Sequence, residues 1–271
     1  MIKHYFLPQS LDEALALLKE HGEDVAVSGG GTHMMMLINN GHIFPRALMG
    51  LRRAGLANIH ANGSLRIGAM STMTQIMQAD TGDLLHTAAQ NVGGWAVRNM
   101  ATVGGNLMMP QPAGDFAVAL LALGADVKLA GPDGERLVPL VDFYASLPHL
   151  KTGELITEII VPHSTGKTAY LKHARREANA PSMVTVAVNL EMDGGTVTAA
   201  RIALNGAGAT PVRATAAERV VTGQALEPQT IAQAAKAAAE ECSPFDDAVA
   251  SAWYRRKMVD VFVKRALEAI V

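Results

Sequence analysis

Two glycine-rich segments, 28–32 (SGGGT) and 101–106 (ATVGGN), contain the residues of this chain most suited to binding an anion. Glycine has no Cβ, so the backbone N–H groups of such a turn can approach a ligand closely. A pair of these turns, each with a small polar side chain beside it, predicts a clamp for a diphosphate. The alternative is an ordinary strand-to-helix turn, although such a turn needs one glycine with positive φ rather than three in a row.

The common nucleotide-binding motifs do not fit these turns. A dinucleotide fold requires G-x-G-x-x-G and an acidic residue about twenty positions later, whereas Gly29-Gly30-Gly31 has the wrong spacing and the segment 50–52 offers no acid. A P-loop requires a glycine five positions before its Gly-Lys-Thr, and the Gly-Lys-Thr at 166–168 lacks it. Another mode of cofactor binding is therefore indicated.

Composition limits the chemistry further. The chain has 271 residues, a formal net charge of −2 and one cysteine, Cys242. The charge gives no basic field for nucleic acid, and one cysteine allows neither an intrachain disulfide nor an all-cysteine iron–sulfur cluster. The nine histidines have no metal-ligand spacing, so we expect no metal site and, for any redox chemistry, an organic cofactor. The absence of a membrane span or signal peptide predicts a cytoplasmic protein.

The pattern of apolar residues places the turns between regular elements. A helix over 11–20 is followed by a short strand, 24–27, which runs into the first turn. A very apolar helix is expected over 115–123, after the second turn. Strands dominate from 170 to 204 and helices follow Pro211, which predicts a three-stranded sheet backed by helices.

Three features of this pattern have competing interpretations. Asp115, at the head of its helix, could be a simple N-cap or a carboxylate that accepts hydrogen bonds from a polyol. Met34-Met35-Met36 is interpreted as core filler, because methionine fits irregular gaps, and the alternative is a role at the cofactor. Trp95 is expected to be a packing residue rather than a ring that stacks on a cofactor.

The segment 98–106 (RNMATVGGN), followed by Pro112-Ala113-Gly114-Asp115, closely resembles the signature of the FAD-binding medium subunit of molybdenum hydroxylases, the carbon monoxide, xanthine and aldehyde dehydrogenase family. Four further stretches match in order: the first glycine turn, 67–72 (IGAMST), 153–157 (GELIT) and the helix that contains Tyr254-Arg255-Arg256. The resemblance therefore spans the whole chain.

For the fold, the resemblance implies an α+β protein with a two-lobed FAD-binding domain of the vanillyl-alcohol-oxidase-like type and a C-terminal α+β domain. The expected boundaries are 1–53 and 54–166 for the two FAD-binding subdomains. The remaining domain, 167–271, is expected to face the flavin and the partner subunits.

For the site, the resemblance implies that both turns hold the FAD diphosphate and that Asp115 binds the ribityl hydroxyls. Thr72 is expected near the flavin, Ile156 near the adenine and Lys172 near the flavin ring. The complete set of expected cofactor-binding residues is Ser28, Gly29, Gly30, Gly31, Thr32, His33, Thr72, Ala101, Thr102, Gly104, Gly105, Asn106, Asp115, Ile156 and Lys172. No catalytic acid or base is expected, because the chemistry belongs to the cofactor.

For the function, the resemblance implies an oxidoreductase subunit that passes electrons through FAD to an external acceptor such as NAD, a quinone or oxygen. A small partner subunit would hold 2Fe–2S clusters and a large partner subunit the molybdenum cofactor, in a dimer of heterotrimers. One alternative is a stand-alone FAD-dependent oxidoreductase that acts on a small substrate. Another is an assembly subunit that has lost FAD, which the intact glycine turns disfavour.

Overall fold

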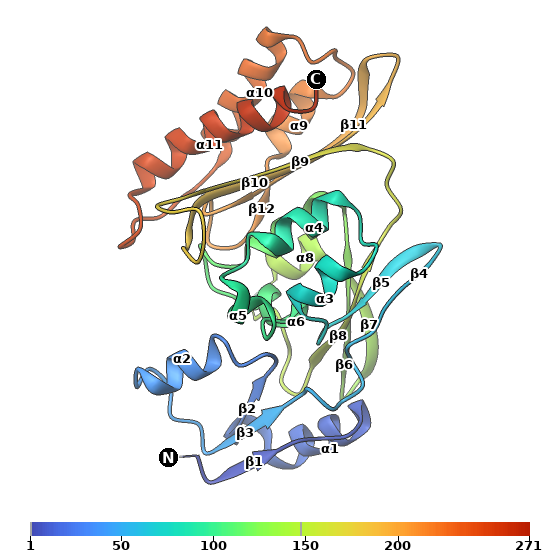
Figure 1. Cartoon of the computed structure of the whole chain (residues 1–271), viewed down its shortest axis with the longest axis vertical. Coiled ribbons are helices and arrows are strands. Elements are labelled where there is room, and N and C mark those ends of the chain that lie inside the picture. The colour runs from blue at the N-terminus through green and yellow to red at the C-terminus, as the bar shows by residue number, and fades with distance from the viewer. Residues whose placement is uncertain (1, 147) are drawn as a thin grey trace.

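The computed structural model describes residues 2–146 and 148–271. Its three sheets follow one another along the long axis of the molecule, from the N-terminal lobe to the C-terminal helices (Figure 1). Each sheet is associated with its own cluster of buried apolar side chains.

The N-terminal sheet has the order β1 (His4–Phe6), β3 (Ala47–Gly50), β2 (Val25–Ser28), and all of its pairings are parallel. Helix α1 (Leu11–His21) connects β1 to β2; its N-cap is Ser10, whose side chain accepts a hydrogen bond from the Glu13 N–H. A 3-10 turn, η1 (Gly22–Asp24), leads into β2, and the first glycine turn connects β2 to helix α2 (Met34–Asn39). The predicted helix and strand before this turn are confirmed.

The middle sheet is antiparallel, with the order β4 (Ile59–Asn62), β5 (Ser64–Gly68), β8 (Leu155–Val161), β6 (Asp126–Gly131), β7 (Gly134–Pro139). Six helices accompany it: α3 (Met73–Gln78), α4 (Asp83–Gln90), α5 (Trp95–Arg98), α6 (Val103–Leu107), α7 (Asp115–Ala122) and α8 (Leu140–Ala145). Every residue of α7 is buried, which explains its continuous apolar sequence.

The C-terminal sheet has four strands rather than the three predicted. Its order is β12 (Val212–Arg213), β11 (Thr196–Asn205), β10 (Ser182–Asp193), β9 (Lys167–Ala174). Strand β12 pairs with Ala203 and Leu204 of β11, and its two residues are too few to show an alternating pattern in the sequence.

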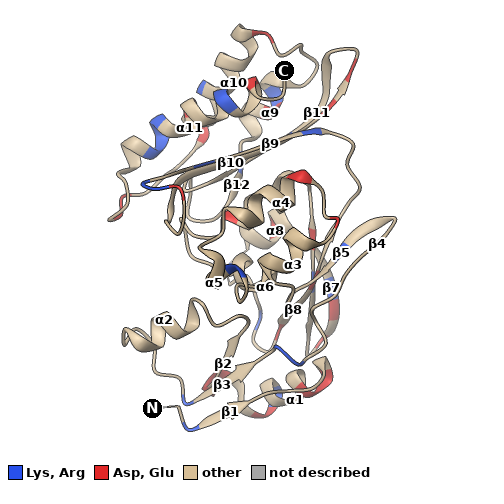
Figure 2. Cartoon of the chain, viewed as in Figure 1, with Lys and Arg blue, Asp and Glu red and all other residues tan. Residues whose placement is uncertain are grey.

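Helices cover both faces of this sheet. Helices α9 (Thr215–Val221) and α11 (Ala252–Glu268) pack on one face, with α10 (Pro228–Glu241) against them, while α4 and α7 pack on the other (Figure 1). Several Lys and Arg residues lie along α11 (Figure 2). Among the described residues, none of these helices combines the length and the apolar character needed to cross a membrane.

Candidate functional site

A cleft of about 650 Å³ lies where the two glycine turns meet. This volume is in the range of sites that bind small molecules and cofactors. The structure brings fourteen of the fifteen expected residues to its wall: Ser28, Gly29, Gly30, Gly31, Thr32, His33, Ala101, Thr102, Gly104, Gly105, Asn106, Asp115, Ile156 and Lys172. Residues from all three sheets therefore contribute to one site.

The two glycine turns touch each other directly. A Cβ built on Gly30 would lie 1.7 Å from the carbonyl oxygen of Met100, and one on Gly29 would lie 2.7 Å from Thr102 Oγ1. Neither position can carry a side chain without movement of the backbone or of Thr102. The glycines thus permit a close approach between segments about seventy residues apart.

The first turn leaves its backbone donors free. The N–H groups of Gly29, Gly30, Gly31 and Thr32 have no hydrogen-bond acceptor among the described residues. Such a run of N–H groups at the edge of a cleft forms an anion-binding surface. Its geometry fits the predicted diphosphate clamp.

The second turn is different, because its amides are already engaged. It begins α6, where Thr102 Oγ1 accepts a hydrogen bond from Gly105 N–H at 3.2 Å. The Gly104 N–H donates to Ala69 O at 2.8 Å, and Asn106 Oδ1 accepts from Ala117 N–H at 3.2 Å. We expected bare N–H groups from both turns; the second turn instead offers the cleft its hydroxyl, its side-chain amide and a surface without Cβ atoms.

Asp115 is not the N-cap of α7. Gly114 occupies that position with φ 97°, and Asp115 is the first helical residue. Its carboxylate forms a buried ion pair with Lys172 of β9, with Nζ and Oδ2 2.7 Å apart. The Lys172 ammonium also donates to Asn91 O at 2.8 Å. The pair lies in the wall of the cleft, where it combines a fixed cation with a carboxylate.

Sequence reasoning missed the groups behind this pair. Ser182, Thr185 and Asn205 each donate a side-chain hydrogen bond to Asp115 Oδ1. All three are completely buried. A polar residue inside an otherwise apolar strand, such as Thr185 within 183–188 (MVTVAV), is the signal that could have indicated them.

Thr72 is the expected site residue that is not among those lining the cleft. It is the N-cap of α3, where its Oγ1 accepts from Gln75 N–H at 3.2 Å and its own N–H donates to Gln75 Oε1. It also forms an isolated β-bridge with Thr102. Thr72 therefore supports the second turn from behind.

The mouth of the cleft includes side chains from α2 and α5, such as Met34, Met36 and Val97. The prediction that Met34-Met35-Met36 fills the core is wrong, because no residue of α2 is buried. Trp95 is likewise 75% exposed rather than packed. Helix α2 carries no charge (Figure 2), so this side of the cleft is an apolar rim.

Two ionisable groups in the cleft have shifted pKa values. Partial burial lowers the pKa of His33, which favours the neutral imidazole. The hydrogen bonds from Arg136 lower the pKa of Glu154, which accepts Nε and Nη2 of that guanidinium at 2.7 and 2.8 Å. Glu154 also accepts the Lys151 N–H and so fixes the loop before β8.

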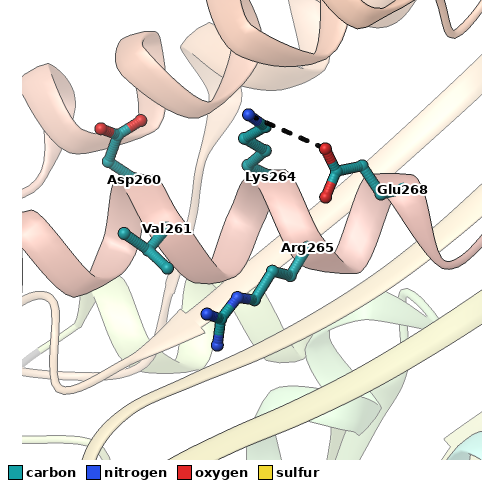
Figure 3. Close-up of a pocket in the computed structure, with 5 residues that line it drawn as sticks. All are labelled: Asp260, Val261, Lys264, Arg265 and Glu268. Carbon is teal, nitrogen blue, oxygen red and sulfur yellow. Dashed lines mark ion pairs between the residues drawn. The ribbon is translucent and has the colours of Figure 1, made fainter.

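A second depression lies on α11, far along the chain from these residues (Figure 3). It is lined by Asp260, Val261, Lys264, Arg265 and Glu268, and Lys264 pairs with Glu268 at 3.8 Å. Both partners of that pair are half exposed, as is typical of a solvated helix face. Within the described residues, no group of three His, Cys, Asp or Glu side chains could hold a metal ion.

Comparisons with known proteins agree with this architecture. Residues 1–164 match the family described as FAD binding domain in molybdopterin dehydrogenase, and residues 169–270 match the CO dehydrogenase flavoprotein C-terminal domain. The chain is 31% identical to the carbon monoxide dehydrogenase medium chain of Afipia carboxidovorans, over 97% of this chain and 95% of that one. It is 32% identical to subunit alpha of the 6-hydroxypseudooxynicotine dehydrogenase complex of Paenarthrobacter nicotinovorans, over 97% and 92%. The structure of reconstituted CO dehydrogenase from Oligotropha carboxidovorans matches with a TM-score of 0.94 and 30% identity, covering 100% of this chain and 97% of that one.

Proposed function

Because this chain belongs to the family of FAD-binding subunits of molybdopterin dehydrogenases, we propose that it is an electron-transfer subunit: it carries FAD and passes electrons from the 2Fe–2S clusters of a partner subunit to an external acceptor. One observation carries this proposal. A single cleft unites the free amides of the first glycine turn with the buried Lys172 ammonium.

The first turn has the chemistry that a diphosphate requires. Its four free N–H groups would hold the diphosphate oxygens, and the glycines leave room for the approach. The Thr102 hydroxyl accepts one hydrogen bond in α6 and keeps its own proton for a ligand. The Asn106 side chain accepts the Ala117 N–H through Oδ1 and keeps its NH₂ group for the cleft.

Other lining residues suit the remaining parts of FAD. Asp115 would accept the ribityl hydroxyls through Oδ2, the oxygen it shares with Lys172. The backbone at Ile156 would lie near the adenine. Lys172 would stand beside the flavin ring, where its fixed positive charge stabilises the reduced, anionic form.

When bound, FAD supplies the redox chemistry by accepting electrons and releasing them to the acceptor. The protein binds it, orients it and sets its potential. The loop residues 179–181, together with Gly93, form one wall of the cleft without a bulky aromatic side chain. This wall would leave the flavin open to an acceptor.

The larger assembly forms part of the same proposal. We expect a large molybdopterin-binding subunit, a small 2Fe–2S subunit and a dimer of heterotrimers. We also retain the vanillyl-alcohol-oxidase-like arrangement and the boundaries 1–53, 54–166 and 167–271. Exposed apolar side chains beside the cleft, Trp95 at 75% and Met100 at 56%, support contact with a partner.

The visible absorption spectrum of the native protein tests this proposal, first with its partners retained and then with them removed. Flavin bands should stay with this chain, and iron–sulfur absorption should leave with the partners. Folded protein without flavin in both states would overturn the assignment. Flavin in a chain that purifies alone would favour a stand-alone oxidoreductase.

The role of Lys172 is tested separately. Lys172→Met should lower the midpoint potential of the bound flavin, because the reduced ring loses its nearby cation. Lys167→Met on the same strand is the control, since Lys167 Nζ donates to Ile270 O at the far end of the domain. An unchanged potential in the first variant would remove Lys172 from this role.

A further inference from the structure

The carboxylate of Asp115 is held by all three long strands of the C-terminal sheet. Thr185 of β10 donates to Oδ1 at 2.8 Å and Asn205 of β11 at 3.1 Å, and Ser182 of β10 donates to the same oxygen. Lys172 of β9 forms an ion pair with the other oxygen, Oδ2. Asp115 itself belongs to the middle part of the chain, so these four contacts join residues 57 to 90 positions apart.

The two carboxylate oxygens have different surroundings. Oδ1 faces three neutral donors that are fully buried, whereas Oδ2 faces Lys172 in the wall of the cleft. A carboxylate offers about four acceptor positions. Three donors on one oxygen therefore fix its rotation and leave the other oxygen aimed at the ammonium.

The C-terminal sheet and the residue that follows β11 also hold the segment that enters α7. Asn205 Nδ2 donates to Pro112 O at 2.7 Å, and Gly206 N–H donates to Gln111 Oε1 at 2.8 Å. Tyr170 OH donates to the backbone oxygen of Asp115 at 3.2 Å. Both the side chain and the backbone of Asp115 are thus fixed by the C-terminal sheet.

The ammonium of Lys172 is fixed as a consequence. An ammonium group has three donors, and two of them have partners in the described part of the chain, Asp115 Oδ2 and Asn91 O. The remaining donor belongs to a side chain that lines the cleft. The direction of this third N–H donor depends on the position of the Asp115 carboxylate. The three buried donors Ser182, Thr185 and Asn205 hold that carboxylate.

We propose that Ser182, Thr185 and Asn205 are positioning residues for the Asp115–Lys172 pair, and that they couple FAD binding to the C-terminal sheet. The inference rests on the proposed function of the cleft. It assigns to the C-terminal domain a second task besides contact with the flavin ring. Neutral donors on Oδ1 also disperse the negative charge of Asp115 and leave the Lys172 charge more effective at the flavin.

Thr185→Val is the decisive variant, because valine keeps the shape of threonine and removes its hydroxyl. Its dissociation constant for FAD should rise about tenfold, the size of effect expected for one hydrogen bond to a charged group. The midpoint potential of the flavin should fall. Thr185→Ser, which restores the hydroxyl, should recover both values.

Thr81→Val is the matched control. Thr81 is also buried, and its Oγ1 donates to Ile76 O at 3.1 Å, away from Asp115. This variant should lower the free energy of unfolding of the FAD-free protein as Thr185→Val does, but leave FAD affinity and potential unchanged. If Thr185→Val does not fold, Ser182→Ala serves the same comparison by removing a second donor from Oδ1.

The outcomes separate the two proposals. Wild-type affinity and potential in folded Thr185→Val and Ser182→Ala would overturn the positioning role, because the hydroxyls would then be purely structural. Failure of the folded wild-type protein to bind FAD would overturn the proposed function instead. Loss of affinity in Thr185→Val that Thr185→Ser recovers supports the coupling.

Discussion

Gly30 lies directly against the backbone carbonyl of Met100, so closely that a Cβ on Gly30 would be 1.7 Å from the carbonyl oxygen. This contact joins the turn after β2 to the turn before α6. It fixes the separation of the two sides of the cleft at the point where the free N–H groups lie. The glycine is therefore required by a non-local contact as well as by the local turn.

Gly30→Ala should separate the turns. We expect the free energy of unfolding to fall by about 1–3 kcal/mol, the usual cost of overpacking, and FAD binding to be lost. Urea unfolding and flavin titration measure the two effects. Gly94→Ala is the control, since a Cβ there would have its nearest neighbour at 3.8 Å, an ordinary contact. Normal FAD affinity in Gly30→Ala would contradict the close approach.

Glu154 should make the free energy of unfolding depend on pH in the acid range. Arg136 lowers the pKa of Glu154 in the folded state. The carboxylate therefore makes its full contribution to the free energy of unfolding above the unfolded-state pKa of 4.5, and this contribution is lost as the pH falls through the lower pKa of the folded state. Glu154→Gln should cost about 1 kcal/mol at pH 7, since Arg136 is 37% exposed and solvent screens the pair. It should also flatten the acid dependence. Urea unfolding from pH 3 to 7 tests this, and an unchanged slope in Glu154→Gln would refute it.

Tyr170 should make the free energy of unfolding depend on pH in the alkaline range, with the opposite sign to Glu154. Burial, together with the nearby Asp115, raises its pKa well above 10 in the folded state. Tyr170 therefore makes its full contribution to the free energy of unfolding below pH 10, the pKa of the unfolded state. This contribution decreases as the pH rises above that value. Tyr170→Phe should cost about 1 kcal/mol, for the lost hydrogen bond to Asp115 O, and should remove part of the alkaline loss. The part due to Tyr144, whose pKa burial also raises, should remain.

Arg255 should be essential for stability, unlike its neighbour Arg256. The Arg255 side chain is completely buried, pairs with Asp247 at 2.8 Å, donates to Met183 O and lies over the ring of Phe245. Arg255→Met removes the charged partner of Asp247, which keeps its hydrogen bonds from the Val249 and Ala250 N–H groups, and takes the guanidinium donor away from Met183 O, at a cost of about 1–3 kcal/mol.

Arg256→Met provides the comparison for this variant. Arg256 is exposed and donates only to Ala239 O among the described residues, so its loss should change the free energy of unfolding by about 0.5 kcal/mol or less. Thermal or urea denaturation of the two variants tests the difference. Equal stability would show that the buried guanidinium is dispensable.

Local patterns in the sequence predicted several elements well. The apolar spacing over 11–20 predicted α1, and the run 115–123 predicted α7. These features depend on residues within one helix. Strand β12 has a weaker local signal, and it was missed.

The sequence by itself determined the family, the two glycine turns and fourteen of the residues that line the cleft, because the family and its glycine turns are encoded in short motifs with fixed spacing. Only the tertiary structure decided how the residues act together. It decided that Gly30 meets Met100, that the second turn uses its amides internally, and that Asp115 is held by the C-terminal sheet. The physical reason is that these contacts join separate parts of the chain: Gly104 donates to Ala69, 35 positions earlier, and Gly30–Met100 and Asp115–Thr185 are each 70 positions apart. Hydrophobic burial of α7 against β10 and β11 sets the position of Asp115.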